Sequence, residues 1–331
     1  MSIFVSHTSA LEFWRAHSLE DVRASRAMPQ PGDVPEKSVL ADFDFAEYGI
    51  VSQPLHLMVS DAASRGQSKQ VVCHTWIKAR VAGSFVCVSD SLYVSSPEAC
   101  FLQVARQLSG IELVAVGLEF CGTYALCGSA VRGFRERPPL TTVGLLRKYL
   151  SKAAGGYGVA NAEKALRYIA EASASPMETM LVMLLCLPCA LGGYGLELPV
   201  LNHRIKVPAS GMGRSRSYCC DLFWPRVKLA VEYDSDMFHT DSKRIANDSH
   251  RRVELLRLGV SVVSITRRQV FDARAFDDAA HTVAKSLGKR LRSIRTDVLT
   301  RRYDLRKHLI EKMRVHGSSK GEWLRGDYVD W

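Results

Sequence analysis

The sequence predicts an α/β protein, and two observations carry this prediction. From Ser175 onward, a helical pattern gives way to three strand-like runs, then to a long amphipathic helix, a further strand and another helix. Helices that alternate with strands in this way cover the faces of a sheet. The chain has 331 residues, 47% of them hydrophobic, which suffices for the cores of two or three domains. This composition excludes a wholly disordered, collagen-like or low-complexity chain.

Residues 1–172 are predicted to form an N-terminal domain of mixed, mainly helical α+β structure. Ser96-Pro97-Glu98 predicts a helix start, because serine caps a helix and proline fits its first turn. Short β-branched runs predict strands within residues 71–76 and 84–94. Prolines predict a loop at 28–37 and a basic linker at 132–139. The helical patterns cover residues 8–17, 111–120, 145–150 and 160–172.

Residues 173–288 are predicted to form the α/β core. Its first helix is broken by Gly192-Gly193-Tyr194-Gly195, and its long amphipathic helix ends at Gly259, a usual helix terminator. The predicted elements are a helix at 176–187, strands at 201–207, 217–223 and 228–233, a helix at 242–258, a strand at 260–266 and a helix at 273–287. Residues 289–331 are predicted to be a basic helical extension, with its helix at 291–313.

The positive charge of the chain is unevenly placed. Residues 1–200 hold 17 Lys and Arg against 18 Asp and Glu, whereas residues 201–331 hold 27 against 16. The formal net charge of +10 therefore originates in the last two-fifths of the chain. Concentrated basic charge is the electrostatic footprint of a polyanion binder. A basic tail of this kind either binds polyanions or stays solvated, and the sequence leaves both alternatives open.

Cysteine usage and apolar runs favour a soluble cytoplasmic protein with no membrane partner. Nine scattered cysteines, an odd number in a long chain, argue against a secreted disulfide framework. Cys186 and Cys189 have C-x-x-C spacing, but their leucine neighbours favour a buried apolar site over zinc or redox chemistry. The N-terminus has no signal-peptide pattern. The longest apolar run, residues 180–187, is far shorter than the ~20 residues that a bilayer requires.

Asp221 and Glu232 are predicted to face each other across a hairpin. Trp224-Pro225-Arg226 predicts a turn, and folding about residues 226–227 sets Asp221 opposite Glu232. Because side chains alternate along a strand, Glu232 and Asp234 share one face. Uncompensated carboxylates repel each other, and a hard divalent cation such as Mg²⁺ relieves that repulsion. The alternative is a solvated polar face of the sheet.

Three further residues have both a structural and a chemical interpretation. Ser175-Pro-Met-Glu178 fits a capping box, in which Glu178 reaches back to the Ser175 N–H, and the same carboxylate can also point past the helix end as a fourth acid. His239 can orient water, act as a base or protonate a leaving oxygen, although a single histidine is more often structural. Arg251 can pair with Asp248 on the helix surface or bind a phosphate.

One ordered set of residues runs through about 174–270. It comprises Glu178, Cys220-Asp221-Leu-Phe-Trp224-Pro225, Lys228-Leu-Ala-Val-Glu232-Tyr-Asp234, His239 and Asp248-x-x-Arg251-x-x-x-Leu255-x-x-x-Gly259. This set resembles the very-short-patch-repair-like branch of the PD-(D/E)XK nuclease superfamily. Residues 74–172, through Ser95-Ser96-Pro97-Glu98, are more weakly similar to the region that precedes such a domain in many actinobacterial proteins, where it looks like part of abortive-infection (AbiEi-like) antitoxin proteins.

The nuclease resemblance implies a restriction-endonuclease-like core, a central mixed sheet flanked by helices, that cleaves DNA with Mg²⁺ or Mn²⁺. Asp221 and Glu232 match the metal ligands, and Glu178 matches the helix glutamate that adds a third. Asp234 stands where the superfamily usually has lysine, and His239 becomes the candidate for the base or for positioning water. The basic residues expected to hold DNA are Arg251, Arg252, Arg267, Arg268, Arg290 and Arg302.

The leading hypothesis is therefore a Mg²⁺-dependent endonuclease in a defence or toxin–antitoxin context. Its N-terminal domain would provide partner contact, substrate selection or regulation, and DNA, with RNA as the alternative, would be its substrate. A second hypothesis is an antitoxin-like DNA-binding regulator with an inactive nuclease-like domain. A third is a protein-partner module whose basic tail contacts RNA. A protein partner and a homodimer are both compatible with the sequence.

Overall fold

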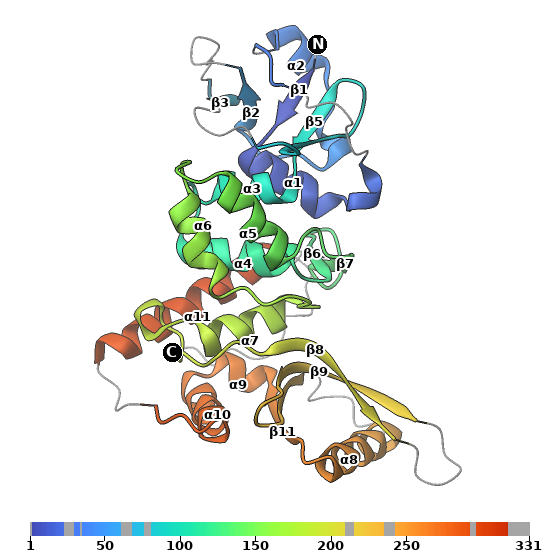
Figure 1. Cartoon of the computed structure of the whole chain (residues 1–331), viewed down its shortest axis with the longest axis vertical. Coiled ribbons are helices and arrows are strands. Elements are labelled where there is room, and N and C mark those ends of the chain that lie inside the picture. The colour runs from blue at the N-terminus through green and yellow to red at the C-terminus, as the bar shows by residue number, and fades with distance from the viewer. Residues whose placement is uncertain are drawn as a thin grey trace. The chain divides into compact units, whose positions relative to one another are not determined.

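The computed structural model describes residues 2–22, 30–33, 35–60, 68–75, 81–208, 215–234, 242–291 and 296–316. The chain divides into two compact units, residues 1–169 and residues 170–318. Each is an α/β arrangement of a mixed sheet with flanking helices, and Figure 1 labels their elements. Within the described residues, none of the helices combines the length and the apolar character that a membrane span requires.

The first unit is built on a five-stranded sheet. Its strands lie in the order β3-β2-β1-β5-β4, and β1 pairs in parallel with β5 but antiparallel with β2. The strands are β1 (Ile3–Val5), β2 (Leu55–Val59), β3 (Val71–Thr75), β4 (Phe85–Cys87) and β5 (Leu92–Ser95). The sequence patterns predicted β3 and the segment of β4 and β5. The patterns did not predict β1 and β2, which have three and five residues.

Helices and one hairpin complete the first unit. The Ser96 hydroxyl accepts a hydrogen bond from the Ala99 N–H, which confirms the predicted cap of α3. The predicted linker at 132–139 instead contains a strand, because β7 (Phe134–Glu136) pairs with β6 (Tyr124–Leu126). The helices are α1 (His7–Ala16), α2 (Lys37–Asp42), α3 (Pro97–Val104), α4 (Gly110–Phe120), α5 (Val143–Lys152) and α6 (Val159–Leu166), with 3-10 turns η1 (Leu19–Asp21) and η2 (Phe45–Tyr48).

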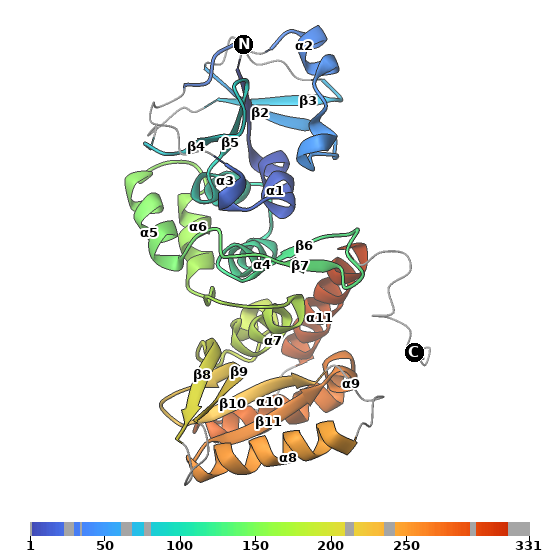
Figure 2. The ribbon, with the colours of Figure 1, turned by 90° about the vertical axis from the view of Figure 1, so that its right-hand side faces the viewer.

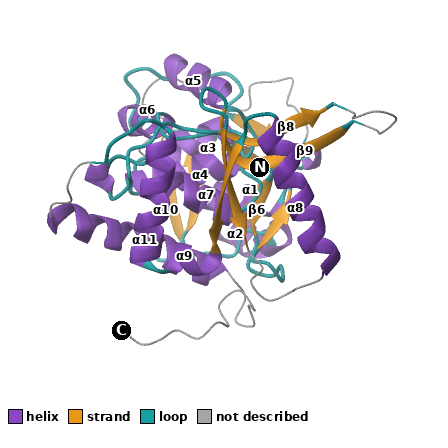
Figure 3. Ribbon diagram, turned by 90° about the horizontal axis from the view of Figure 1, so that it is seen from below, coloured by secondary structure: helices purple, strands orange, loops and turns teal. Residues whose placement is uncertain are grey.

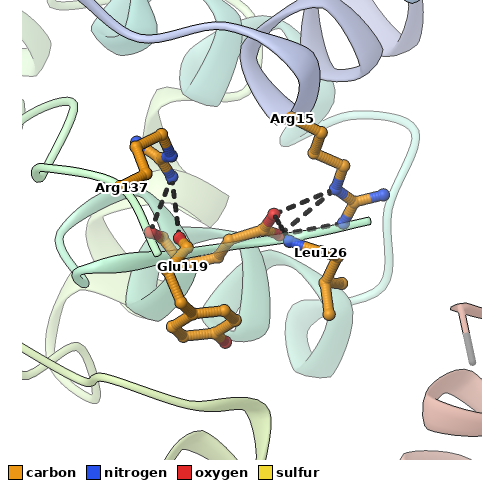
Figure 4. A network of polar contacts seen from close by, with 5 residues as sticks. Arg15, Glu119, Leu126 and Arg137 are labelled. Carbon is orange, nitrogen blue, oxygen red and sulfur yellow. Dashed lines mark hydrogen bonds and ion pairs between the residues drawn. The ribbon is translucent and has the colours of Figure 1, made fainter. Parts of the chain in front are cut away.

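A buried ion pair joins α1 to α4 and the β6–β7 hairpin (Figure 4). The Arg15 guanidinium donates to both carboxylate oxygens of Glu119, at 2.9 to 3.3 Å, and the Leu126 N–H donates to the same carboxylate. Arg137 donates to the main-chain carbonyls of Glu119 and Tyr124. Burial would raise the pKa of Glu119, but the Arg15 charge and hydrogen bonds hold that pKa below its usual value. The carboxylate is therefore a structural anion.

The second unit is built on a four-stranded sheet in the order β11-β10-β9-β8. Strands β8, β9 and β10 form an antiparallel meander, and β11 pairs in parallel with β10 after the crossover helix α8. The elements are α7 (Pro176–Cys186), η3 (Cys189–Leu191), β8 (Val200–Val207), β9 (Arg216–Trp224), β10 (Leu229–Asp234), α8 (Ser242–Arg257), β11 (Ser261–Thr266), α9 (Arg267–Phe271), α10 (Ala273–Ser286) and α11 (Thr296–His316). The predicted order of helix, three strands, helix, strand and helix is present.

Helices cover both faces of this sheet. Figure 2 shows α8 along one side and α7 on the other. On the α8 side, Leu255 packs against Phe223, Ala230 and Val260. Every residue of α7 is buried, which explains why its sequence is apolar all round rather than amphipathic. The sheet is therefore a middle layer, and its strand ends are where polar side chains can gather.

The predicted basic extension supplies α11, which packs within the second unit. Gly192, at φ +90°, lies so close to this helix that a Cβ atom there would be 2.2 Å from the Arg301 carbonyl oxygen. The Arg302 guanidinium lies 3.7 Å from the centre of the Tyr194 ring and 2.6 Å from Asp277 Oδ1. The glycine-rich break that ends the first helix thus also provides the contact surface for α11.

Candidate functional site

The candidate site begins where β9 and β10 separate. The two strands pair at Leu229 with Trp224, Ala230 with Phe223 and Val231 with Leu222, which is the register that the predicted turn requires. Beyond Val231, β10 pairs only with β11, while β9 continues alongside β8. If the ladder continued, Asp221 would be opposite Glu232, so Asp221 lies where β9 and β10 begin to separate.

At this point the side chains of β8 and β9 stop alternating regularly between the two faces of the sheet. Asn202 adopts φ +49°, and the β8–β9 ladder omits its pairing with Asp221 although it is regular on either side. Cys220 and Phe223 belong to one apolar cluster, whereas residues three apart on a regular strand point to opposite faces. The backbone irregularity turns the Asp221 side chain toward β10, where its Oδ2 accepts a 2.8 Å hydrogen bond from the Tyr233 N–H.

Glu178 approaches the same point from the first turn of α7. The predicted capping by Ser175 is present, since its hydroxyl accepts from the Glu178 N–H. The Glu178 carboxylate reaches one residue further than a standard capping box and accepts from the Ala174 N–H at 2.8 Å instead of from the Ser175 N–H. It also accepts from the Asn202 amide at 2.6 Å and from the Ser175 hydroxyl at 2.9 Å. Hydrogen bonds from these three groups fix the orientation of the Glu178 carboxylate.

Glu178, which is buried, and Asp221, which is half-buried, both have shifted pKa values. Burial raises the pKa of Glu178, hydrogen bonds from the Ala174 N–H and other donors oppose that rise, and the charge of Asp221 raises the pKa further. Burial also raises the pKa of Asp221, against the Tyr233 N–H and the charge of Arg251. A carboxylate whose charged form is destabilised by burial, and in Glu178 also by a second carboxylate, favours a neighbouring cation.

Glu232 faces α8 and already has a cationic partner. An Arg251 guanidinium nitrogen lies 2.5 Å from Glu232 Oε1 and also donates to the Cys219 carbonyl oxygen. The Arg251 charge also opposes the rise in the pKa of Asp221, which places this arginine close to two of the predicted acids. In this conformation Arg251 supplies the positive charge that the sequence assigned to a metal ion.

Of the two other predicted catalytic residues, Asp234 and His239, the structure places only Asp234. Asp234 ends β10 and pairs in the parallel ladder with Thr266. His239 lies outside the described residues. The predicted convergence of Asp221, Glu232 and Asp234 on one side of the hairpin is therefore replaced by a different grouping, in which Glu178 and Asp221 are neighbours and Glu232 pairs with Arg251. The strand irregularity at Asn202 and Asp221 is the physical reason.

Two of the predicted phosphate contacts are used within the fold. Arg302 is buried against Tyr194 and Asp277, so its guanidinium does not have the surface position that a DNA contact needs. Arg251 is occupied by Glu232 and Cys219. The exposed members of the predicted set are Arg252, Arg268 and Arg290, with Arg267 half-buried over the Phe271 ring. Arg252 additionally donates to the Ser264 hydroxyl.

The Glu178–Asp221 pair fits a Mg²⁺ ion only in part. Mg²⁺ usually takes one or two carboxylates and keeps several waters, and these two acids provide that number, each with a pKa that burial raises. Among the residues that the structure describes, however, there is no group of three or more His, Cys, Asp or Glu side chains arranged to hold a metal ion. Glu232 would have to exchange Arg251 for the ion to join such a group.

The interpretation of this site rests on its own geometry, because comparisons with known proteins found no match. No family model matches the chain, and no match was found among curated proteins or among solved structures.

Asn202, which no sequence pattern singled out, links Glu178 to β9, the strand that carries Asp221. Its amide donates to the Glu178 carboxylate and to the Ala172 carbonyl oxygen, and its Oδ1 accepts from the Cys219 thiol at 3.5 Å. A signal was available, because asparagine is depleted in strands and tolerates left-handed backbone. A polar residue of this type inside the run 201–207, across from Asp221, predicts an irregular strand.

Proposed function

We propose that the second unit is a metal-dependent endonuclease domain that cleaves DNA, as the sequence resemblance implies. The observation that carries the proposal is the pairing of the buried Glu178 with the half-buried Asp221 at the point where β9 and β10 separate. The order of α7, a three-stranded antiparallel meander, α8 and a parallel β11 is consistent with the restriction-endonuclease-like core that the resemblance implies. The proposal places this activity in the cytoplasm, in a defence or toxin–antitoxin context.

In this proposal the chain's own residues position the reacting groups. Glu178 and Asp221 would hold Mg²⁺ or Mn²⁺, with Glu232 joining them when it exchanges Arg251. A bound ion of this kind polarises a phosphoryl oxygen and activates a water molecule. Arg251, released from Glu232, would then be available to the phosphate. Asp234 and His239 follow on the same segment and stay candidates for orienting the water.

A nicking assay tests the proposal. Supercoiled plasmid is incubated with the full chain in Mg²⁺, in Mn²⁺ and in EDTA. Asp221→Asn, which retains an oxygen acceptor for the Tyr233 N–H, should lower the nicking rate at least 100-fold, the order of effect seen when an electrostatic catalytic group is lost. Asp278→Asn removes an exposed acid from α10 and should leave the rate unchanged.

The enzyme proposal fails if the intact protein cuts no DNA or RNA substrate with either metal. It also fails if Asp221→Asn cuts as fast as the Asp278→Asn control, because the activity would then belong to a contaminant or to another site. Thermal melting of both variants shows whether a lost activity reflects a lost fold.

A DNA-binding regulator without nuclease activity is the second candidate, and a specific observation favours it. Arg251 neutralises Glu232, and both oxygens of Glu178 already accept hydrogen bonds, so the acids are stable without a metal ion. Calorimetric titration with Mn²⁺ separates the two functions. Metal binding that Asp221→Asn abolishes favours the nuclease, whereas DNA binding with no heat from Mn²⁺ favours the regulator.

A further inference from the structure

Strands β8 and β9 continue beyond the four-stranded sheet as a two-stranded ribbon. They pair from Arg204 with Cys219 to Val207 with Arg216, whereas the pairing of β10 with β9 covers only residues 222–224 of β9. Figure 1 and Figure 3 show the two strands extending together past the neighbouring elements. This ribbon, residues 203–207 and 216–220, has two chemically different faces.

One face of the ribbon is anchored. Ile205 and Tyr218 pack against the apolar cluster that contains Leu255 of α8. The Tyr218 hydroxyl donates to the Glu254 carboxylate, and Arg216 lies 3.7 Å from the same carboxylate. These contacts fix the ribbon to α8, so its opposite face has a defined position relative to the sheet.

The opposite face is exposed and basic. Arg204 pairs with Cys219 and Lys206 pairs with Ser217, so the four side chains share this face, and all four are exposed. Residues 203–207 and 215–219 contain no Asp or Glu. In the described part of the chain neither Arg204 nor Lys206 forms an ion pair. The surface therefore presents two uncompensated positive charges about 7 Å apart along a strand.

This open face leads directly to the acid pair. Cys219, the cross-strand partner of Arg204, donates to Asn202, and Asn202 donates to Glu178. Asp221 is two residues beyond Cys219 on the same strand. A polyanion held by Arg204 and Lys206 would thus run along the ribbon toward Glu178 and Asp221.

We propose that the open face of the β8–β9 ribbon is a docking surface for duplex DNA, on which Arg204 and Lys206 contact backbone phosphates beside the bond presented to Glu178 and Asp221. The position of that bond rests on the proposed function, but the docking itself does not. A two-stranded ribbon fits the major groove of B-form DNA, which is about 12 Å wide. The major groove of duplex RNA is too deep and narrow to admit it.

Binding in EDTA tests the proposal independently of cleavage. Fluorescence anisotropy with a labelled 30-base-pair DNA duplex gives the affinity of the full chain as a function of salt. The double variant Arg204→Ala/Lys206→Ala should lower the affinity at least tenfold near 0.1 M salt. The slope of log K against log salt should become shallower by about 1.8, because each lost phosphate contact contributes about 0.9.

A matched control separates a specific surface from net charge. Arg274→Ala/Lys285→Ala removes two exposed positive charges from α10 and should leave the slope unchanged. Equal losses in the two double variants, no loss in the ribbon variant, or no DNA binding by the wild-type chain each overturn the proposal. Equal or tighter binding of duplex RNA or single strands through the same two residues overturns the assignment to duplex DNA.

Thiol protection gives a second readout without a variant. Cys219 lies on the open face, and Cys189 is exposed elsewhere in the same unit. Bound duplex should slow alkylation of Cys219 and leave that of Cys189 unchanged, as measured by mass spectrometry of the two peptides. Unprotected Cys219 at saturating DNA contradicts the proposal. Ribbon-dependent binding without any Mg²⁺-dependent nicking would reject the nuclease and retain the docking surface.

Discussion

Two buried carboxylates, Glu119 and Glu178, and the half-buried Asp221 have pKa shifts of different direction because their neighbours differ. Glu119 has Arg15 within hydrogen-bond distance, and that charge outweighs the effect of burial and lowers its pKa. Burial has the largest effect on the pKa values of Glu178 and Asp221 and raises both, and the charge of Asp221 adds to the rise for Glu178. Arg15 balances the charge of Glu119 within the fold, whereas a cation would further stabilise the charges of Glu178 and Asp221.

Glu119→Gln should destabilise the first unit by about 2 kcal/mol, because it leaves the half-buried Arg15 guanidinium without its counter-charge. Urea unfolding at pH 7 measures this change. Glu163→Gln, at an exposed position of α6, is the control and should stay within about 0.5 kcal/mol of wild type. A similarly small effect of Glu119→Gln would show that the ion pair adds no net stability.

At the scale of elements, strand irregularity and close helix contact decide where polar groups lie. The left-handed Asn202 turns β8 and β9 so that Asp221 and Glu178 become neighbours. Gly192 has a comparable role for α11, because the absence of a Cβ lets the helix approach the chain after η3. Both features depend on single residues with positive φ.

Gly192→Ala should destabilise the second unit by about 3 kcal/mol, because the new Cβ overlaps the Arg301 carbonyl oxygen and the backbone is left-handed. Gly195→Ala is a matched control, since its φ is +67° but no atom lies within 4 Å of the added Cβ. The control should cost only about 1 kcal/mol of backbone strain. Equal melting temperatures for the two variants would contradict the close packing of α11.

At the scale of the whole molecule, the two units differ in charge and in titratable groups. The excess of Lys and Arg lies after residue 200, within the unit that carries the candidate site. The first unit instead contains three clustered histidines. His56 Nδ1 lies 2.8 Å from His74 Nε2, and the rings of His7 and His74 stack at 3.6 Å.

Acid should destabilise the first unit through His7. Burial lowers the pKa of His7, and the charges of His74, His56 and Arg106 lower it further. Because the folded pKa is below the unfolded value of about 6.5, the stability is fully present above that value and is lost as pH falls. One excluded proton contributes a slope of up to about 1.4 kcal/mol per pH unit.

Hydrogen exchange at pH 5 to 8 measures this loss for peptides of each unit. His7→Asn removes the titrating ring and tolerates the left-handed backbone at φ +53°, so it should flatten the pH dependence of the first unit. His281→Asn, at an exposed position of α10, should leave that dependence unchanged. A steep acid response in His7→Asn would assign the loss to other groups.

Much of the fold follows from local sequence. The Ser96 and Ser175 caps, the stop of α8 near Gly259 and the turn that pairs Leu229 with Trp224 depend on residues close in the chain, so pattern and propensity predict them. The candidate acids Glu178, Asp221 and Glu232 were also identified in this way. What was not predictable was their grouping, because alternation along a regular strand was assumed and Asn202 interrupts it.

The sequence by itself determined the α/β class, the order of elements in the second unit and the segregation of positive charge, since these depend on periodicity, capping and composition. Only the tertiary structure decided which groups meet. It paired Glu232 with Arg251, placed Asp221 near Glu178 and buried the α11 residue Arg302 against Asp277. The physical reason is that these contacts join residues 19 to 43 positions apart, and strand pairing and helix packing, not local spacing, set such distances.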